Sequence, residues 1–246
     1  MTVSRNDMIN QLRQDILLME GYKPPAASAK PVELGPMGSA FPHGIFPVGT
    51  LHEFLTDGPE NGAASSGFIA GLVAALMASG GVAVWIRSPG SSGRVFPPAL
   101  KYFGLDPGQV IFFDLKTERE ALWAMEEALT CEGLAAVVAE IREVNFTASR
   151  RLQLAVEQSR VTGFLLRQNP RNKHTIACAA RWKVSVMASE PELLMPGLGF
   201  PRWHIELERV RNGHPGSWQM EWLAGRFHPV VQEVRGSALE HPRKTG

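Results

Sequence analysis

A short glycine- and serine-rich stretch, "GAASSGFI", holds the first residues whose types and spacing could do chemistry. Two glycines stand five positions apart, between a strand-like run and an apolar helix, which is the context of a phosphate-binding loop. In such a loop backbone N–H groups hold phosphates, a lysine neutralises their charge and a hydroxyl binds magnesium. Phe68 stands here at the lysine position and Ile69 at the hydroxyl position. The sequence therefore predicts a degenerate phosphate loop made of Gly62, Ser65, Ser66, Gly67, Phe68 and Ile69.

The other reactive side chains do not assemble into a catalytic pattern. His204, Glu206 and Glu208 share one strand face, but no second ligand cluster supports a metal there, so we interpret them as an exposed strand face. The chain lacks a G-x-S-x-G nucleophile elbow, and neither Cys131 nor Cys178 has a recognisable histidine partner. We therefore expect no catalytic residue, no metal site and no cofactor.

Basic residues gather in the second half of the chain. Between Glu157 and Glu190 there is no acidic residue, and the loop "RQNPRNKHT" within this stretch could hold nucleic-acid phosphates. Two further arginines lie near the start of a predicted helix, where their charge is unfavourable to the helix dipole. The alternative is a solvated basic face, with an arginine paired to a local acid such as Glu143. The candidate DNA or partner contacts are Arg150, Arg151, Arg167, Arg171, Lys173, Arg181 and Lys183.

Composition limits the class of protein. The chain has 246 residues, 44% of them hydrophobic, with 25 basic and 24 acidic side chains. It is long enough to bury a substantial core, and its balanced charge gives no global attraction to nucleic acid or membrane. The two cysteines cannot form a disulfide framework, and the apolar run from Phe68 is too short to span a bilayer. We expect a cytoplasmic protein without a membrane anchor.

The chain divides into four segments. Residues 1–22 are predicted to form an amphipathic helix, since its apolar residues recur at helical spacing, and residues 23–36 are a Pro- and Ala-rich linker. The core is assigned to residues 37–235, followed by a polar, flexible tail over 236–246. The apolar face of the first helix is a candidate surface for docking on the core, a partner or a second copy, and consists of Met8, Leu12, Ile16 and Met19.

Within the core, apolar strands alternate with helices. Strands are predicted at 50–55, 82–86, 110–115, 134–140 and 163–167, and helices at 67–79, 96–104, 117–129 and 147–160. Continuously apolar strands separated by helices indicate a mainly parallel sheet covered on both faces. After residue 175 apolar and polar residues alternate, which predicts antiparallel strands at the C-terminal edge. Trp85 and Trp123 are expected at a buried sheet–helix interface.

Several stretches together resemble one protein family. "HGIFPVGTLHEFLTDGPENGAASSGFIAGL" is similar to RecA-related proteins around their ATP loop, with an insertion near Asn61–Ala64. "LWAMEEALTCEGLAAVVAEI", "TASRRLQLAVEQS" and "PGLGFPRWHIELERVRNGHPGSWQMEW" follow in the order found in the ImuA family. This family comprises RecA-related accessory proteins of bacterial damage-induced mutagenesis, and the resemblance covers roughly residues 40 to 225. It implies an α/β, RecA-like P-loop-type core, with Glu140 at the position of the Walker B aspartate.

The resemblance also implies partners. They are a catalytically inactive Y-family-polymerase-like protein and an error-prone replicative-type polymerase, with RecA itself as a further candidate. In a RecA-like fold the segment after "GFLLR" leads to the DNA-binding loops, so the basic loop could meet DNA or a RecA filament.

Three functional hypotheses follow. The first is a non-catalytic adaptor in SOS-induced translesion synthesis. The second is a nucleotide-gated ATPase, in which Arg87 or Arg94 would replace the lysine and Glu140 would hold magnesium. The third is a module that binds single-stranded DNA through Arg171 and Lys173. Self-association remains open in each case.

Overall fold

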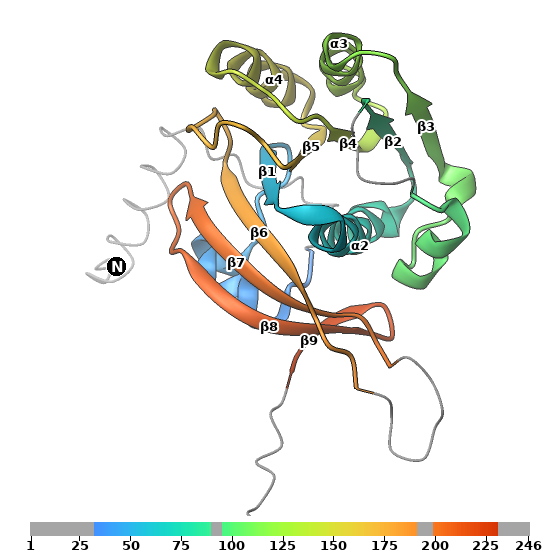
Figure 1. Cartoon of the computed structure of the whole chain (residues 1–246), viewed down its shortest axis with the longest axis vertical. Coiled ribbons are helices and arrows are strands. Elements are labelled where there is room, and N and C mark those ends of the chain that lie inside the picture. Colours follow the sequence, from blue (N-terminus) through green and yellow to red (C-terminus); the bar gives the residue numbers. More distant parts are fainter. Residues whose placement is uncertain (1–31, 90–94, 191–198, 231–246) are drawn as a thin grey trace, which may run out of the picture.

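The protein was analysed as a computed structural model that describes residues 32–89, 95–190 and 199–230. These residues form one nine-stranded sheet in the order β3-β2-β4-β5-β1-β6-β7-β8-β9 (Figure 1). The strands are β1 (Leu51–Thr56), β2 (Val82–Arg87), β3 (Val110–Asp114), β4 (Leu134–Glu140), β5 (Thr162–Gln168), β6 (Ala180–Met187), β7 (Arg202–Val210), β8 (Gly216–Leu223) and β9 (Arg226–Pro229). The α-helices are α2 (Gly58–Leu76), α3 (Glu118–Leu129) and α4 (Phe146–Ser159). The short 3-10 helices are η1 (Gly35–Ala40), η2 (Pro42–Gly44), η3 (Met77–Ser79), η4 (Pro97–Phe103) and η5 (Pro107–Gln109).

The direction of the strands confirms the predicted fold class. Strands β1 to β6 run parallel to one another, whereas β7, β8 and β9 each pair antiparallel with the preceding strand. Helices α3 and α4 cover one face of the parallel part and α2 the other (Figure 1). Every residue of β1 and β5 is buried, which explains why these strands do not alternate. The architecture is that of a RecA-like core with an antiparallel extension.

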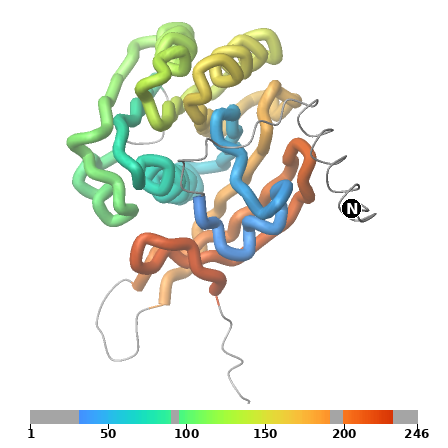
Figure 2. Tube along the Cα trace, turned by 180° about the vertical axis from the view of Figure 1, so that it is seen from behind, coloured from blue at the N-terminus to red at the C-terminus, as the bar shows by residue number. Residues whose placement is uncertain are grey.

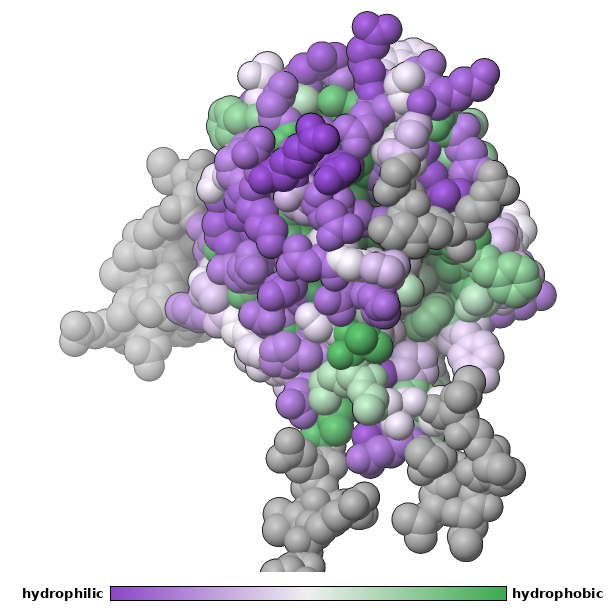
Figure 3. Space-filling view, in the orientation of Figure 1, coloured by the Kyte–Doolittle hydropathy of each residue, from purple (hydrophilic) through white to green (hydrophobic). Residues whose placement is uncertain are grey.

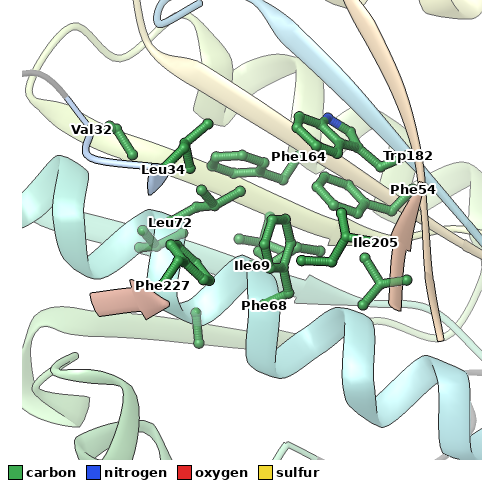
Figure 4. Packing of buried hydrophobic residues seen from close by; sticks show 14 of the residues in the cluster. Val32, Leu34, Phe54, Phe68, Ile69, Leu72, Phe164, Trp182, Ile205 and Phe227 are labelled. Carbon is green, nitrogen blue, oxygen red and sulfur yellow. The ribbon is translucent and has the colours of Figure 1, made fainter. Parts of the chain in front are cut away.

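Helix α2 is the central element of the larger core. Phe68, Ile69 and Leu72 pack among aromatic and aliphatic side chains from the sheet, including Phe54 and Phe227 (Figure 4). With the residues up to Ser79, the helix is long and apolar enough to cross a membrane, but most of it is buried inside the protein. Its composition is therefore explained by packing between the sheet and the curved C-terminal strands.

The segment from Val32 to Phe46 belongs to the core, which corrects the predicted end of the linker at residue 36. Val32 and Leu34 are buried, and η1 contacts β8 and β9 (Figure 2). The backbone N–H of His214 donates to Ala40 O at 2.9 Å, which ties this segment to the turn between β7 and β8. The first helix (1–22), residues 23–31 and the tail (236–246) lie outside the described residues.

Helix α3 begins with a capping box. Thr117 Oγ1 accepts from the Glu120 N–H, and the Glu120 carboxylate accepts from the Thr117 N–H. The expectation for Trp85 is confirmed, since it is 1% exposed, but that for Trp123 is wrong, since it is 62% exposed. Ala121, Met125 and Leu129 carry the buried face of α3, and Trp123 is rotated about 200° from Ala121 at 100° per residue.

Gly71 allows the C-terminal strands to approach α2. A Cβ atom at this position would lie 2.9 Å from the Trp222 ring and 3.1 Å from the Phe227 ring. We expect Gly71→Ala to destabilise the fold by about 1–3 kcal/mol through overpacking, against a helix-propensity gain of up to about 1 kcal/mol. Urea unfolding measures the difference.

The matched control for this prediction lies on the same helix. At Gly62 an added Cβ would meet no atom closer than 3.6 Å. Gly62→Ala should therefore leave stability unchanged or raise it by up to about 1 kcal/mol. Equal effects of the two substitutions would show that Gly71 is not a packing constraint.

Candidate functional site

The predicted phosphate loop is not a loop. Helix α2 begins at Gly58, so every residue from Gly62 to Ile69 is helical. Inside a helix each backbone N–H donates to the carbonyl four residues earlier, and only the first turn keeps free N–H groups. The stretch that would have to wrap around phosphates therefore has no donors to offer. The sequence placed the helix start at residue 67, because the glycines and serines before it are typical of a turn.

The actual start of α2 is also unsuited to an anion. Pro59 has no N–H group, and the Gly58 N–H already donates to Asn169 Oδ1 at 2.8 Å. Asp57 and Glu60 place two carboxylates at this end of the helix. Phosphates would meet negative charge here instead of the donor array that a helix N-terminus can supply.

Phe68, at the position of the lysine, lies at the centre of an aromatic cluster. Its ring centroid is 4.9 Å from that of Phe227, 5.9 Å from those of Trp182 and Trp203, and 6.1 Å from that of Phe54. The side chain is fully buried and points into the core (Figure 4). Ile69 and Ser65 are fully buried as well, so these positions contribute to packing and not to a ligand site.

A small cavity of about 230 Å³ remains where a nucleotide site would lie, at the carboxyl ends of β4 and β5 beside α2. The predicted residues Gly62, Ser66, Gly67 and Glu140 line it together with apolar residues from the η4 region. Its size is below the roughly 300–1,000 Å³ of typical small-molecule pockets. The structure thus brings these four predicted residues together around one cavity.

Glu140 is held inside this site by hydrogen bonds. It is 3% exposed, and its carboxylate accepts from Trp85 Nε1 at 2.8 Å and from Gln168 Nε2 at 3.2 Å. The Ser88 hydroxyl donates to the Glu140 backbone carbonyl at 2.8 Å. A carboxylate in an apolar cavity repels phosphate unless a cation compensates its charge.

Arg167 and Arg181, two of the predicted contact residues, are engaged in ion pairs within the sheet. Arg167 Nη1 lies 2.8 Å from Glu53 Oε1, and Arg181 Nε lies 2.7 Å from Glu53 Oε2. The Arg167 side chain is completely buried and also donates to Asn172 O at 2.7 Å. Glu53 thus joins β1 to its neighbours β5 and β6 through both of its oxygens.

The sequence analysis missed the central role of Glu53, although a signal was present. Glu53 is the one acidic residue in the apolar run "TLHEFL", and a buried acid of this kind requires a cationic partner. Cys178 lies against the same carboxylate, with its sulfur 3.7 Å from Glu53 Oε2. Burial, reinforced by the Glu53 charge, raises the pKa of the Cys178 thiol to about 12, so this cysteine is not a nucleophile at neutral pH.

The other basic candidates are mostly engaged in local contacts. Arg151 Nη2 lies 2.6 Å from Glu126 Oε2, Lys173 Nζ 3.1 Å from Asp57 Oδ1 and Lys183 Nζ 3.9 Å from Glu206 Oε1. The Arg150 guanidinium donates to Gln153 Oε1 at 2.8 Å, while Arg171 is held through its backbone N–H by Glu143. The pairing of Arg151 is the local alternative that the sequence analysis left open.

Two further sets of predicted residues can be placed. No group of three His, Cys, Asp or Glu side chains with metal-binding geometry occurs in the part of the chain that the structure describes. His204 Nε2 lies 3.6 Å from Glu206 Oε1 on the half-exposed face of β7. The apolar face of the first helix, with Met8, Leu12, Ile16 and Met19, lies outside the described residues.

Comparison with known proteins identifies the family. The chain is 36% identical over 193 residues to the "Protein ImuA" of Caulobacter vibrioides strain NA1000 / CB15N. The aligned region covers 74% of this chain and 78% of the relative. The corresponding protein of strain ATCC 19089 / CIP 103742 / CB 15 gives the same values. The chain belongs to the ImuA family. No protein-family model matches it. The predicted resemblance is therefore confirmed, and the altered nucleotide site belongs to an ImuA-family chain.

The buried ion cluster around Glu53 yields a stability prediction. Glu53→Gln leaves two arginines facing one neutral amide, and breaking a buried ion pair costs about 3–5 kcal/mol. We expect a loss of this size in the free energy of unfolding, measured with urea. Glu206→Gln, which removes a half-exposed carboxylate 3.9 Å from Lys183, serves as control and should cost at most about 1 kcal/mol. Equal small losses in both variants would mean that the cluster does not stabilise the sheet.

The aromatic environment of Phe68 yields a second prediction. Phe68→Lys restores the residue type of a phosphate loop but places an ammonium group among buried rings, where desolvation costs several kcal/mol. We expect loss of the cooperative thermal transition, followed by circular dichroism. Ala63→Lys introduces the same group at an exposed position of α2 and should change stability by no more than about 0.5 kcal/mol. A Phe68→Lys protein as stable as wild type would contradict the placement of this side chain.

Proposed function

We propose that this chain is a non-catalytic adaptor in SOS-induced, error-prone translesion DNA synthesis, acting in the cytoplasm through protein–protein contacts. One observation carries the proposal. The residues that would form a phosphate loop are part of the continuous helix α2, and Phe68 among them is buried in the core. Membership of the ImuA family supplies the biological context. The chain kept the packing of a RecA-like core and lost the groups that bind and hydrolyse a nucleotide.

Three independent features support the absence of catalysis. The stretch from Gly62 to Ile69 has no free backbone donors, the end of α2 carries Asp57 and Glu60, and the remaining cavity contains the buried carboxylate of Glu140. Removing one catalytic group from a phosphate site lowers its rate strongly, and here the cradle, the lysine and the metal-binding hydroxyl are replaced together.

The adaptor acts through partners of the mutagenesis machinery. In our proposal these are a catalytically inactive Y-family-polymerase-like protein and an error-prone polymerase, and RecA is a third candidate. In our proposal the RecA-like core contributes the contact surface, and the first helix is a candidate element for docking on a neighbour.

A nucleotide-gated ATPase is the second candidate, and one observation favours it. A cavity persists at the expected place, with Ser66 and Glu140 in its wall. Such an enzyme would require a donor array other than the helical stretch, and groups that replace the lysine and the metal-binding hydroxyl at Phe68 and Ile69. The adaptor needs neither, so we prefer it.

Damage-induced mutagenesis in a strain that depends on this chain tests the proposal. Ser66→Ala removes the hydroxyl from the cavity wall, and Glu140→Gln removes the carboxylate charge with little change in size. An adaptor should retain a mutation frequency within about twofold of wild type, since it does not use either group for nucleotide chemistry. Immunoblotting controls for the amount of each protein. A tenfold loss of mutagenesis at normal protein levels would contradict a non-catalytic role.

Co-purification tests the adaptor role itself. The full chain, co-expressed with the Y-family-polymerase-like protein and the error-prone polymerase of the same bacterium, should form a complex that survives gel filtration. Absence of a complex with either protein and with RecA would contradict an adaptor of this machinery, even if mutagenesis remained independent of Ser66 and Glu140.

A further inference from the structure

A second, more open pocket of about 300 Å³ lies on the opposite side of the sheet from α2, next to α4. One wall is the N-terminal half of α4, with Phe146, Arg150 and Gln153. The facing wall is the end of β7 with Arg209 and Arg211, and residues 175–178 form the floor. Two segments far apart in the sequence thus present arginines to one space.

The walls of this pocket are fixed by the fold. The Ala177 N–H donates to Ser149 Oγ at 2.9 Å, which attaches the floor to α4. The Arg211 N–H donates to Ala179 O at 2.7 Å, which attaches the end of β7 to the same segment. These bonds hold both walls to one floor. The backbone positions of the three arginines are therefore fixed by the fold and do not require a ligand.

The charge of the pocket is positive. No carboxylate lines it, and neither Arg209 nor Arg211 has a carboxylate partner among residues 32–89, 95–190 and 199–230. Arg150 is bound to the neutral amide of Gln153. Arg209 is the cross-strand neighbour of Arg181, whose charge is compensated by Glu53. The nearest buried acid, Glu53, is already bridged by two arginines.

An exposed aromatic ring stands beside the charges. Phe146 is 58% exposed and lies one helical turn before Arg150, so both side chains project from the same face of α4. The surrounding surface in the region of α4 and the β5–β6 loop is mainly hydrophilic (Figure 3). An aromatic ring next to basic side chains is the combination that binds single strands, because the ring stacks on a base while the cations hold phosphates.

We propose that this pocket binds the backbone of single-stranded DNA, with phosphates at Arg150, Arg209 and Arg211 and a base on Phe146. The site takes only Thr175 from the predicted basic loop, in which Arg167 is paired with Glu53. The inference is independent of the adaptor proposal, since an adaptor can act with or without its own DNA contact.

Fluorescence anisotropy of a labelled 20-nucleotide oligothymidylate with the full chain tests the site. We expect binding at about 50 mM salt, with a logarithmic salt slope near −2 for about three phosphate contacts. The Arg209→Glu, Arg211→Glu double variant should bind at least about tenfold more weakly, since two favourable contacts become repulsive. Lys101→Glu, Arg119→Glu changes the net charge equally at exposed positions outside the pocket and should leave affinity within about twofold.

Phe146→Ala separates stacking from charge. It should weaken binding of the oligothymidylate by about fivefold or more and leave binding of an abasic oligomer of the same length unchanged. No binding by the wild-type chain at about 50 mM salt, or equal weakening by the two charge-reversal pairs, would overturn the site. If polyglutamate displaced the labelled oligothymidylate as effectively as unlabelled oligothymidylate does, the pocket would be assigned to acidic polypeptides. That result would overturn the DNA proposal.

Discussion

The burial of Phe68 between the sheet and the C-terminal strands is the interaction on which the rest of the structure depends. Full burial of such a side chain contributes about 1.5–3 kcal/mol, and its ring contacts join α2 to Trp182, Trp203 and Phe227. This contact requires α2 to run as a helix through the positions that would otherwise wrap around a nucleotide. The burial of Phe68 therefore both stabilises the core and removes the phosphate site.

Buried charge imposes the second constraint. Glu53 sits in the middle of the sheet, and a carboxylate there must be compensated, so it binds Arg167 and Arg181. The basic residues that looked available for DNA are thereby used to hold β1, β5 and β6 together. Arg150, Arg209 and Arg211, which have no such partner among the described residues, lie elsewhere, around the pocket between α4 and the end of β7. Whether an arginine is available for a ligand depends on its distance from buried carboxylates such as Glu53, and a count of basic residues does not give that distance.

Much of the fold follows from local patterns, because apolar strands, the Thr117 capping box and the alternating C-terminal strands are encoded in neighbouring residues. The residues around the altered site were selected because the resemblance to RecA-related proteins aligns them with nucleotide-site positions. The helical start at Gly58 and the ion cluster depend on tertiary contacts, whereas the exposure of Trp123 follows from the helical spacing of α3 and could have been predicted from the sequence. Small residues such as those before Gly67 suit a turn or a helix, and only packing against η4 and β7 decides between them.

If packing has replaced nucleotide binding, a calorimetric titration of the full chain with ATP and magnesium should detect no heat of binding up to millimolar nucleotide. This expectation follows because the helical stretch lacks donors and because Phe68 and Ile69 occupy the positions of the lysine and the metal-binding hydroxyl. Binding with a dissociation constant in the micromolar range would contradict it. It would mean that other groups supply the missing charge and donors, and that the chain is a nucleotide-gated switch.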